Sequence, residues 1–447
     1  MKDPKGKRTG IIPFTEQNLA FYADGYKFNF LMAEQEKPFR TKIFKPSEDG
    51  FLCGKTYSGH DIAIYVGKQD IPVGGCCSLT AGAYFVSTSN VQETDMDGFW
   101  GMEFVGGTLD ELMTRDPSAL DFTPEGDLLI KQEDDTKKYT FHIEDQECVL
   151  KIRTSSTWGT GLKGVRVQDT GVHLRIEFPS RKPRCEAFRY LAIIKEMLSF
   201  MTFRGNVGFD KIFLLKEPDE HKHRWNSVQV FVRNDYELAR ISWLRSISFE
   251  DLGELISPLL ETLIKNNDRE PTYMLGFIPK SERDLLQISD STVREVCSAL
   301  ECEMTYIHDL CAEEEEHLQT LIKDVKKLVK DHRKGENQLS PKTYDLIFSS
   351  VKNWSMSAGD KISMLYHRYE QEMLVINPFH IHISDDEINE FVKYRNHITH
   401  GYHRVMDLKV GATAHVLQGL VYCCLLTRIG MSREQILKLC QEHKILS

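Results

Sequence analysis

The sequence lacks several patterns that identify common enzyme chemistries. It contains no Cys-x-x-Cys pair and no Gly-x-Ser-x-Gly nucleophile elbow. The double glycines Gly74-Gly75 and Gly106-Gly107 form neither a P-loop nor a dinucleotide fingerprint. These absences argue against a zinc ribbon and against a hydrolase with that elbow, and these glycine pairs give no support for a nucleotide-binding loop.

The 11 cysteines are scattered along the chain, so we expect free thiols in a reducing compartment. A group of four potential metal ligands lies close in sequence, at spacings that match no common zinc site. Its members are Cys297, Cys302, Cys311 and His317. The sequence therefore predicts neither a bound metal nor a cofactor.

The chain also lacks an excess of positive charge. A net charge of -10 argues against a protein that coats nucleic acid through bulk charge. One segment, residues 393–409, is nevertheless basic and would attract a phosphate-bearing ligand. It carries Lys393, Arg395, Arg404 and Lys409 against Asp407, together with His397, His400 and His403.

Apolar stretches are short in this sequence. The N-terminal residues have no apolar segment of the kind found in signal peptides, and no uninterrupted apolar run approaches membrane-spanning length. We expect a cytoplasmic protein with no membrane partner.

The residues from 1 to 235 have the pattern of a β-rich domain. Short β-prone runs alternate with glycines, which favours a barrel or a sandwich. Apolar residues at helical spacing predict one helix over Cys185–Phe203, preceded by the basic cluster Arg181–Arg184, which we interpret as a solvated loop. The predicted strands are 61–66, 82–86, 101–105, 149–152, 173–178, 211–215 and 227–232.

The residues from 245 to 447 change to a helical period. The predicted helices form a bundle, which gives an α+β chain with a β-rich first domain and an all-helical second domain. The expected helices are 249–264, 291–310, 311–332, one from Ser340-Pro341, 361–374, 387–400, 410–429 and 433–443.

The helix from 387 to 400 carries the most informative residues. Ser384 and Glu387 form a capping-box pattern at its start, and Gly401 is placed to end it. On a helical wheel, Arg395 falls on the apolar face of the helix, where a charged side chain requires a polar partner or a functional role. Asn396 and His400 share a polar strip beside it.

An arginine and a histidine together suit RNA cleavage without a metal. RNA supplies its own nucleophile, the ribose 2′-OH, so the enzyme must move protons and stabilise a pentacoordinate phosphorane. Histidine suits the first task near neutral pH, and arginine suits the second. The alternative is that Arg395 makes a buried ion pair and His400 is a helix-end histidine.

The segment Lys393-Tyr394-Arg395-Asn396-His397-Ile398-Thr399-His400-Gly401 resembles the Arg-polar-spacer-His motif of the HEPN superfamily. The start of an upstream helix at Gly359-Asp360-Lys361 resembles the one that often precedes this motif. The β-rich front domain is similar to the N-terminal domain of ApeA-type anti-phage proteins, whose C-terminal domain is a HEPN domain.

The resemblance implies a metal-independent endoribonuclease of anti-phage defence, acting by abortive infection. Arg395 would bind the scissile phosphate, His400 would act as general base or acid, and Asn396 would orient the histidine or a phosphate oxygen. The products would be 2′,3′-cyclic phosphate and 5′-OH ends. A homodimer through the HEPN bundle would place both Arg-His sets in one cleft.

Further expectations concern the partners. Lys393, Tyr402 and Arg404 are candidates to hold the RNA, with tRNA among the substrates considered. The front domain would sense a phage-derived trigger and regulate the ribonuclease. Two alternatives stay open: a non-catalytic HEPN-type module that binds RNA, nucleotide or a partner protein, and a carbohydrate- or peptide-binding β-domain on a helical oligomerisation module.

Overall fold

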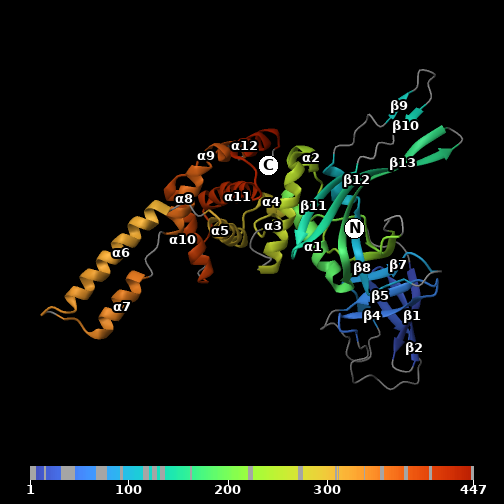
Figure 1. Ribbon diagram of the computed structural model, residues 1–447, viewed down its shortest axis with the longest axis horizontal. Helices are drawn as coiled ribbons and strands as arrows, with labels where there is room; N and C mark the ends of the chain where they lie inside the picture. The colour runs from blue at the N-terminus through green and yellow to red at the C-terminus, as the bar shows by residue number, and fades with distance from the viewer. Residues whose placement is uncertain are drawn as a thin grey trace. The chain divides into compact units, whose positions relative to one another are not determined.

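The structure is a computed structural model of the 447-residue chain. It divides into two compact units, Met1–Asp268 and Arg269–Ser447, which are described separately (Figure 1). The description covers all residues except 1–6, 15–16, 32–45, 67–77, 91–93, 114–119, 123–127, 131–135, 162–163, 220–224, 270–274, 308–309, 311, 337, 353–356, 377–380, 402–404 and 444–447.

The first unit is built on a 13-stranded sheet in which every pairing is antiparallel. Its strands are β1 (Lys7–Phe14), β2 (Gln17–Asp24), β3 (Lys27–Leu31), β4 (Phe51–Thr56), β5 (Asp61–Tyr65), β6 (Ser78–Thr80), β7 (Ala83–Ser87), β8 (Gly98–Val105), β11 (Lys137–Ile143), β12 (Gln146–Gly161), β13 (Gly164–Pro183), β14 (Lys211–Leu215) and β15 (Asn226–Val232). The short strands β9 (Leu120–Phe122) and β10 (Leu128–Ile130) pair only with each other.

The order of the strands differs from the barrel or sandwich that we expected. They run β11-β12-β13-β8-β14-β15-β7-β5-β4-β1-β2-β3-β6, so the described strands form one sheet with two ends. The α+β class is confirmed in this coarse form. The finer expectation was wrong because the long strands β12 and β13 extend the same sheet instead of starting a second one.

The β6 end of this sheet curls over its own face. The rings of Phe28 on β3 and Tyr84 on β7 meet edge to face at 5.4 Å, although four strands separate β3 from β7 in the sheet order. The hydroxyl of Tyr26 donates to the carbonyl of Val232 at 2.7 Å. Aromatic and aliphatic side chains fill the curl, among them Phe21, Phe30, Ile62, Ile64 and Leu79.

The other face of the sheet is covered by helix α1 (Ala187–Thr202), close to the predicted Cys185–Phe203. Phe188 packs against Phe51 of β4 and Phe85 of β7, and Tyr190 packs against Phe178 of β13 at 4.5 Å. Burial of such aromatic side chains contributes much of the stability of a domain of this kind.

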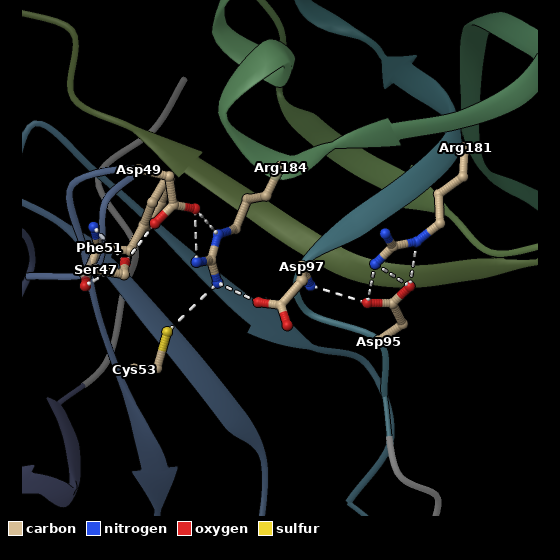
Figure 2. A network of polar contacts seen from close by, with 8 residues as sticks. All are labelled: Ser47, Asp49, Phe51, Cys53, Asp95, Asp97, Arg181 and Arg184. Carbon is tan, nitrogen blue, oxygen red and sulfur yellow. Dashed lines mark hydrogen bonds and ion pairs between the residues drawn. The ribbon is translucent and has the colours of Figure 1, made fainter.

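The basic cluster that precedes α1 is not a solvated loop, contrary to our interpretation. Figure 2 shows Arg184 lying between Asp49 and Asp97, and Arg181 paired with Asp95. Arg184 is only 2% exposed, because its guanidinium stacks over the ring of Phe51, 4.2 Å from the ring centroid. The apolar cover and the acidic partners together bury this charge.

The helical segment after β15 belongs to the first unit. It comprises α2 (Phe249–Leu252) and α3 (Ile256–Arg269). Its carboxylates bind strand β11: Glu261 accepts from the backbone N–H of His142 at 2.9 Å, and Glu250 pairs with Lys137 at 2.7 Å. The boundary between the units at Asp268 and Arg269 therefore lies later than the 235–245 junction of our domain assignment.

All the secondary-structure elements described in the second unit are helices. Its helices are α4 (Glu282–Leu286), α5 (Asp290–Met304), α6 (Ala312–His332), α7 (Pro341–Lys352), α8 (Ala358–Arg368), α9 (Glu370–Ile376), α10 (Asp385–Thr399), α11 (Leu408–Arg428) and α12 (Arg433–Glu442). The predicted helix 361–374 is two helices, because Tyr369 leaves helical geometry at φ -109° and ψ 19°.

Helix α11 is the core helix of this unit. Among the described residues it alone has the length and apolar composition to cross a membrane, which our reading of the sequence did not identify. Of the most apolar 18-residue stretch of this helix, 78% is buried inside the protein, as expected for a core helix. Its buried residues include Leu417, Leu420, Val421 and Leu425.

Candidate functional site

The candidate site lies at the C-terminal end of α10, and the sequence defines that helix at both ends. The Ser384 hydroxyl accepts from the backbone N–H of Glu387, and the Glu387 carboxylate accepts from the backbone N–H of Ser384 at 2.9 Å. The helix α10 ends at Thr399, His400 is its C-cap residue, and Gly401 follows with φ +80°. Both predicted caps are confirmed.

The helical wheel placed Arg395 on the apolar face of α10, and in the structure its side chain is partly exposed beside that face. Ile388 and Phe391 on that face are fully buried, while the Arg395 side chain is 20% exposed. Its guanidinium forms an ion pair with Glu301 of α5, and its Nε donates to the Cys297 sulfur at 3.1 Å. The arginine therefore has a partner on the neighbouring helix.

The structure brings Arg395 and Asn396 together but does not bond either of them to His400. Arg395 Nη1 donates to Asn396 Oδ1 at 3.1 Å. His400 is exposed, and its ring makes no hydrogen bond or ion pair with any residue that the structure describes. The imidazole is thus free to meet a ligand one turn beyond the arginine.

The thiol of Cys297 belongs to this contact. Burial raises the pKa of Cys297, and the nearby Arg395 guanidinium only partly offsets that rise. A protonated thiol is a weak acceptor and does not neutralise the arginine. Glu301 carries the negative charge at this site, and its side chain is 44% exposed.

The three residues considered for RNA binding have different positions. Lys393 is exposed and forms an ion pair with Glu390 one turn earlier, at 2.8 Å. Tyr402 and Arg404 lie outside the described residues. The basic character of this segment is reduced locally, since Lys393 and Arg395 both face carboxylates.

Sequence periodicity does not identify Glu301 and Cys297 as neighbours of Arg395. They lie more than 90 residues earlier in the chain, and the contact depends on how α5 packs beside α10. A second link between the same helices runs from the Tyr394 hydroxyl to Asp290 at 2.8 Å. In α5, Glu301 follows the buried Cys297 by four positions, the only local signal that they share a face.

Of the potential metal ligands near Cys297, Cys311 lies outside the described residues. Among the residues that are described, no three His, Cys, Asp or Glu side chains are placed to hold a metal ion. The eight described cysteines are all free thiols.

Comparison of the chain with models of protein families, with curated proteins and with solved structures gave no match.

The cap at Ser384 supports the helix that carries the site. We expect Ser384→Ala to destabilise the protein by about 1 kcal/mol, because the backbone N–H of Glu387 loses its side-chain acceptor. Thermal unfolding of the full chain measures the effect. Lys393→Ala is the control on the same helix, since it removes only an exposed ion pair worth about 0.3 kcal/mol. Equal unfolding temperatures for the two variants would contradict the assignment of the cap.

Proposed function

We propose that this chain is a metal-independent endoribonuclease with a HEPN-type helical bundle and a composite site built around Arg395, Asn396 and His400. The observation that carries the proposal is the hydrogen bond between Arg395 and Asn396 beside an exposed His400. A phosphate is held by a guanidinium, and an adjacent imidazole exchanges its proton with solvent and substrate.

In this mechanism the pairing of Arg395 with Glu301 is the resting arrangement. A phosphate oxygen takes the place of the exposed Glu301 carboxylate on the guanidinium. Arg395 then stabilises the charge that develops on the phosphorane. His400 takes the proton of the 2′-OH or supplies one to the leaving 5′ oxygen.

One imidazole does not serve as acid and base in the same step. The proposal therefore includes a homodimer through the helical bundle, in which a second copy supplies the other His400. A twofold axis makes such an interface isologous. The remaining parts of the proposal are a cytoplasmic location, an RNA substrate such as tRNA, and control by the sheet-containing first unit in response to a phage-derived trigger.

The test is to map RNA ends made by the full chain and by two variants. In the presence of EDTA, and in cells under phage challenge, we expect the parent to produce 2′,3′-cyclic phosphate ends. Arg395→Ala and His400→Ala should each reduce cleavage by a factor on the order of 10² to 10³. A parent that makes no such ends in either setting would refute the proposal.

Two matched variants control for changes in the fold. Arg294→Ala removes an exposed arginine from α5, and His397→Ala removes an exposed histidine from α10 itself. Both should cleave like the parent, since neither side chain belongs to the proposed site. If His397→Ala is as inactive as His400→Ala, the assignment of His400 is wrong.

A second candidate function is favoured by the ion pair between Arg395 and Glu301. If this pair serves only to hold α5 against α10, the helical unit is a binding module for RNA, nucleotide or a partner protein. That function predicts RNA binding by a folded dimer without the formation of cyclic phosphate ends. It also predicts that Arg395→Ala lowers the unfolding temperature while His400→Ala leaves it unchanged.

A further inference from the structure

A serine, a histidine and a glutamate lie in a line across three adjacent strands of the first unit. Ser155 is on β12, His173 on β13 and Glu103 on β8. In the pairing register, Arg153 lies opposite His173, and Arg175 lies opposite Glu103. Each member of the line is thus diagonal to the next on the same face, and side chains of this length reach one another across such a diagonal.

The distances join the three side chains into one chain of hydrogen bonds. Ser155 Oγ lies 2.7 Å from His173 Nε2, and His173 Nδ1 lies 3.2 Å from Glu103 Oε1. Burial would raise the pKa of Glu103, but the hydrogen bond from His173 and the charge of Arg175 outweigh it and lower the pKa to about 2. Glu103 is therefore ionised at neutral pH and only accepts hydrogen bonds.

An ionised Glu103 fixes the hydrogens of the neutral imidazole. Nδ1 of His173 must carry the hydrogen that it donates to Glu103, so Nε2 has a free lone pair. The Ser155 hydroxyl then donates to Nε2 at 2.7 Å, a closer acceptor than the Gly171 carbonyl at 3.4 Å. A hydroxyl bonded to a base that a carboxylate orients is the arrangement that activates a nucleophilic serine.

The carboxylate of this group is buried, whereas the histidine and the serine are partly exposed, as a nucleophilic site requires. Glu103 is 2% exposed, while the side chain of His173 is 18% exposed and Ser155 is partly exposed. Side chains alternate along β13, so His173 points away from the face on which Leu174 and Ile176 are buried. The serine and the histidine are accessible, and the carboxylate behind them is not.

The histidine and the serine are not needed to neutralise Glu103. Its Oε1 already pairs with Arg175 at 3.1 Å and with Arg153 at 3.4 Å. Two guanidinium groups satisfy a buried carboxylate without an imidazole and a hydroxyl in series. A network that only buried this charge would not require His173 to be aligned with Ser155.

We propose that Ser155, His173 and Glu103 form an acyl-transfer site that hydrolyses carboxylic esters. Ser155 Oγ forms a bond to the ester carbonyl carbon while its proton passes to His173 Nε2. The carbonyl–alkoxide bond then breaks, and the same proton leaves with the alcohol. Water attacks the acyl-serine in the same way, releasing the carboxylic acid and restoring the Ser155 hydroxyl. Glu103 is a positioning residue, because it acts through His173.

Arg153 is placed to stabilise the oxyanion of the tetrahedral intermediate. It lies two residues before Ser155 on the same face of β12, and its side chain is 47% exposed. One of its nitrogens faces Glu103, which leaves the other N–H groups of the guanidinium as donors toward solvent. A fixed cation beside the developing charge is worth more in the transition state than in the ground state.

The experiment is to treat the full chain with a fluorophosphonate probe and locate the adduct by mass spectrometry. We expect phosphonylation of Ser155 with loss of fluoride, at a rate that falls about 10²-fold or more in His173→Ala. Added imidazole should restore part of that rate, which a merely structural role of the histidine would not allow. Ser180→Ala is the control, because Ser180 is a partly exposed serine of β13 bonded to Gln146 rather than to a histidine.

Hydrolysis of p-nitrophenyl acetate tests the positioning role of Glu103. We expect Glu103→Gln to lower kcat about 10²-fold or more with little change in KM, and Glu103→Asp to recover part of it. The proposal is overturned if Ser155 of the folded parent stays unlabelled, if only other residues react, or if His173→Ala reacts at the parental rate. It is independent of RNA cleavage, so either proposal can fail alone.

Discussion

Replacing Asp49 by alanine is expected to destabilise the first unit by about 3 to 5 kcal/mol, because it leaves a buried guanidinium without its main partner. Asp49 accepts from Nη2 of Arg184 at 2.8 Å and from Nε at 3.2 Å. Arg184 is 2% exposed and covered by the ring of Phe51, so water does not replace the lost carboxylate. Thermal or urea unfolding of the full chain, followed by a probe of sheet structure, measures the loss.

Asp97→Ala is the matched control for the same arginine. Asp97 is 81% exposed and lies 3.6 Å from Arg184 Nη1, so its loss should cost less than about 1 kcal/mol. The two variants make the same change in residue type, but the contacts that they remove differ in burial and in distance. Equal losses would show that Arg184 does not depend on Asp49.

Acid is expected to weaken the first unit through Glu103. The pKa of this carboxyl is lowered from 4.5 to about 2 in the folded chain, because the donors around it outweigh the effect of burial. A lowered folded-state pKa stabilises the fold at pH values above 4.5, and this stabilisation is lost as the pH falls from about 5 to about 2. The full loss is about 3 kcal/mol for such a shift in a buried group.

Unfolding free energies of the parent and of Glu103→Gln, measured from pH 7 to pH 2, isolate this contribution. Other carboxyls with lowered pKa values, such as Asp49 and Glu387, titrate in both proteins and cancel in the difference. We expect the variant to be less stable at pH 7 and the two curves to converge toward pH 2. Parallel curves would mean that Glu103 has no lowered pKa in the folded protein.

The local signals in the sequence predicted local structure well. The boundaries of α10 follow from Ser384, Glu387 and Gly401, whose contacts are formed within a few residues. The split between α8 and α9 was missed, because no glycine or proline lies near Tyr369 to indicate the end of a helix. The helical spacing of apolar residues continues past Tyr369, and only the backbone dihedral angles of this residue show that the helix ends there.

The pattern of apolar residues in the sequence could not predict which distant strands and helices pair with each other. Strands β1 to β4 were not predicted, and neither was their position at the far end of a single sheet. In the candidate site, the apolar position of Arg395 predicted that it needs a partner, but not that Glu301 would be that partner. Likewise, Ser155 and His173 are 18 residues apart, and only the strand register aligns them.

The order of strands in the sheet has a consequence for how the chain folds during synthesis. β8 lies between β13 and β14, and β7 pairs with β15. These strands are synthesised early, but they can pair only after later strands, up to Val232, have been synthesised. Closing such long loops before any pairing is gained makes folding slow. Because the chain leaves the ribosome from its N-terminus, this sheet has all its strands before residues 385–399 exist. The first unit therefore has the opportunity to fold before Arg395 and His400 are made.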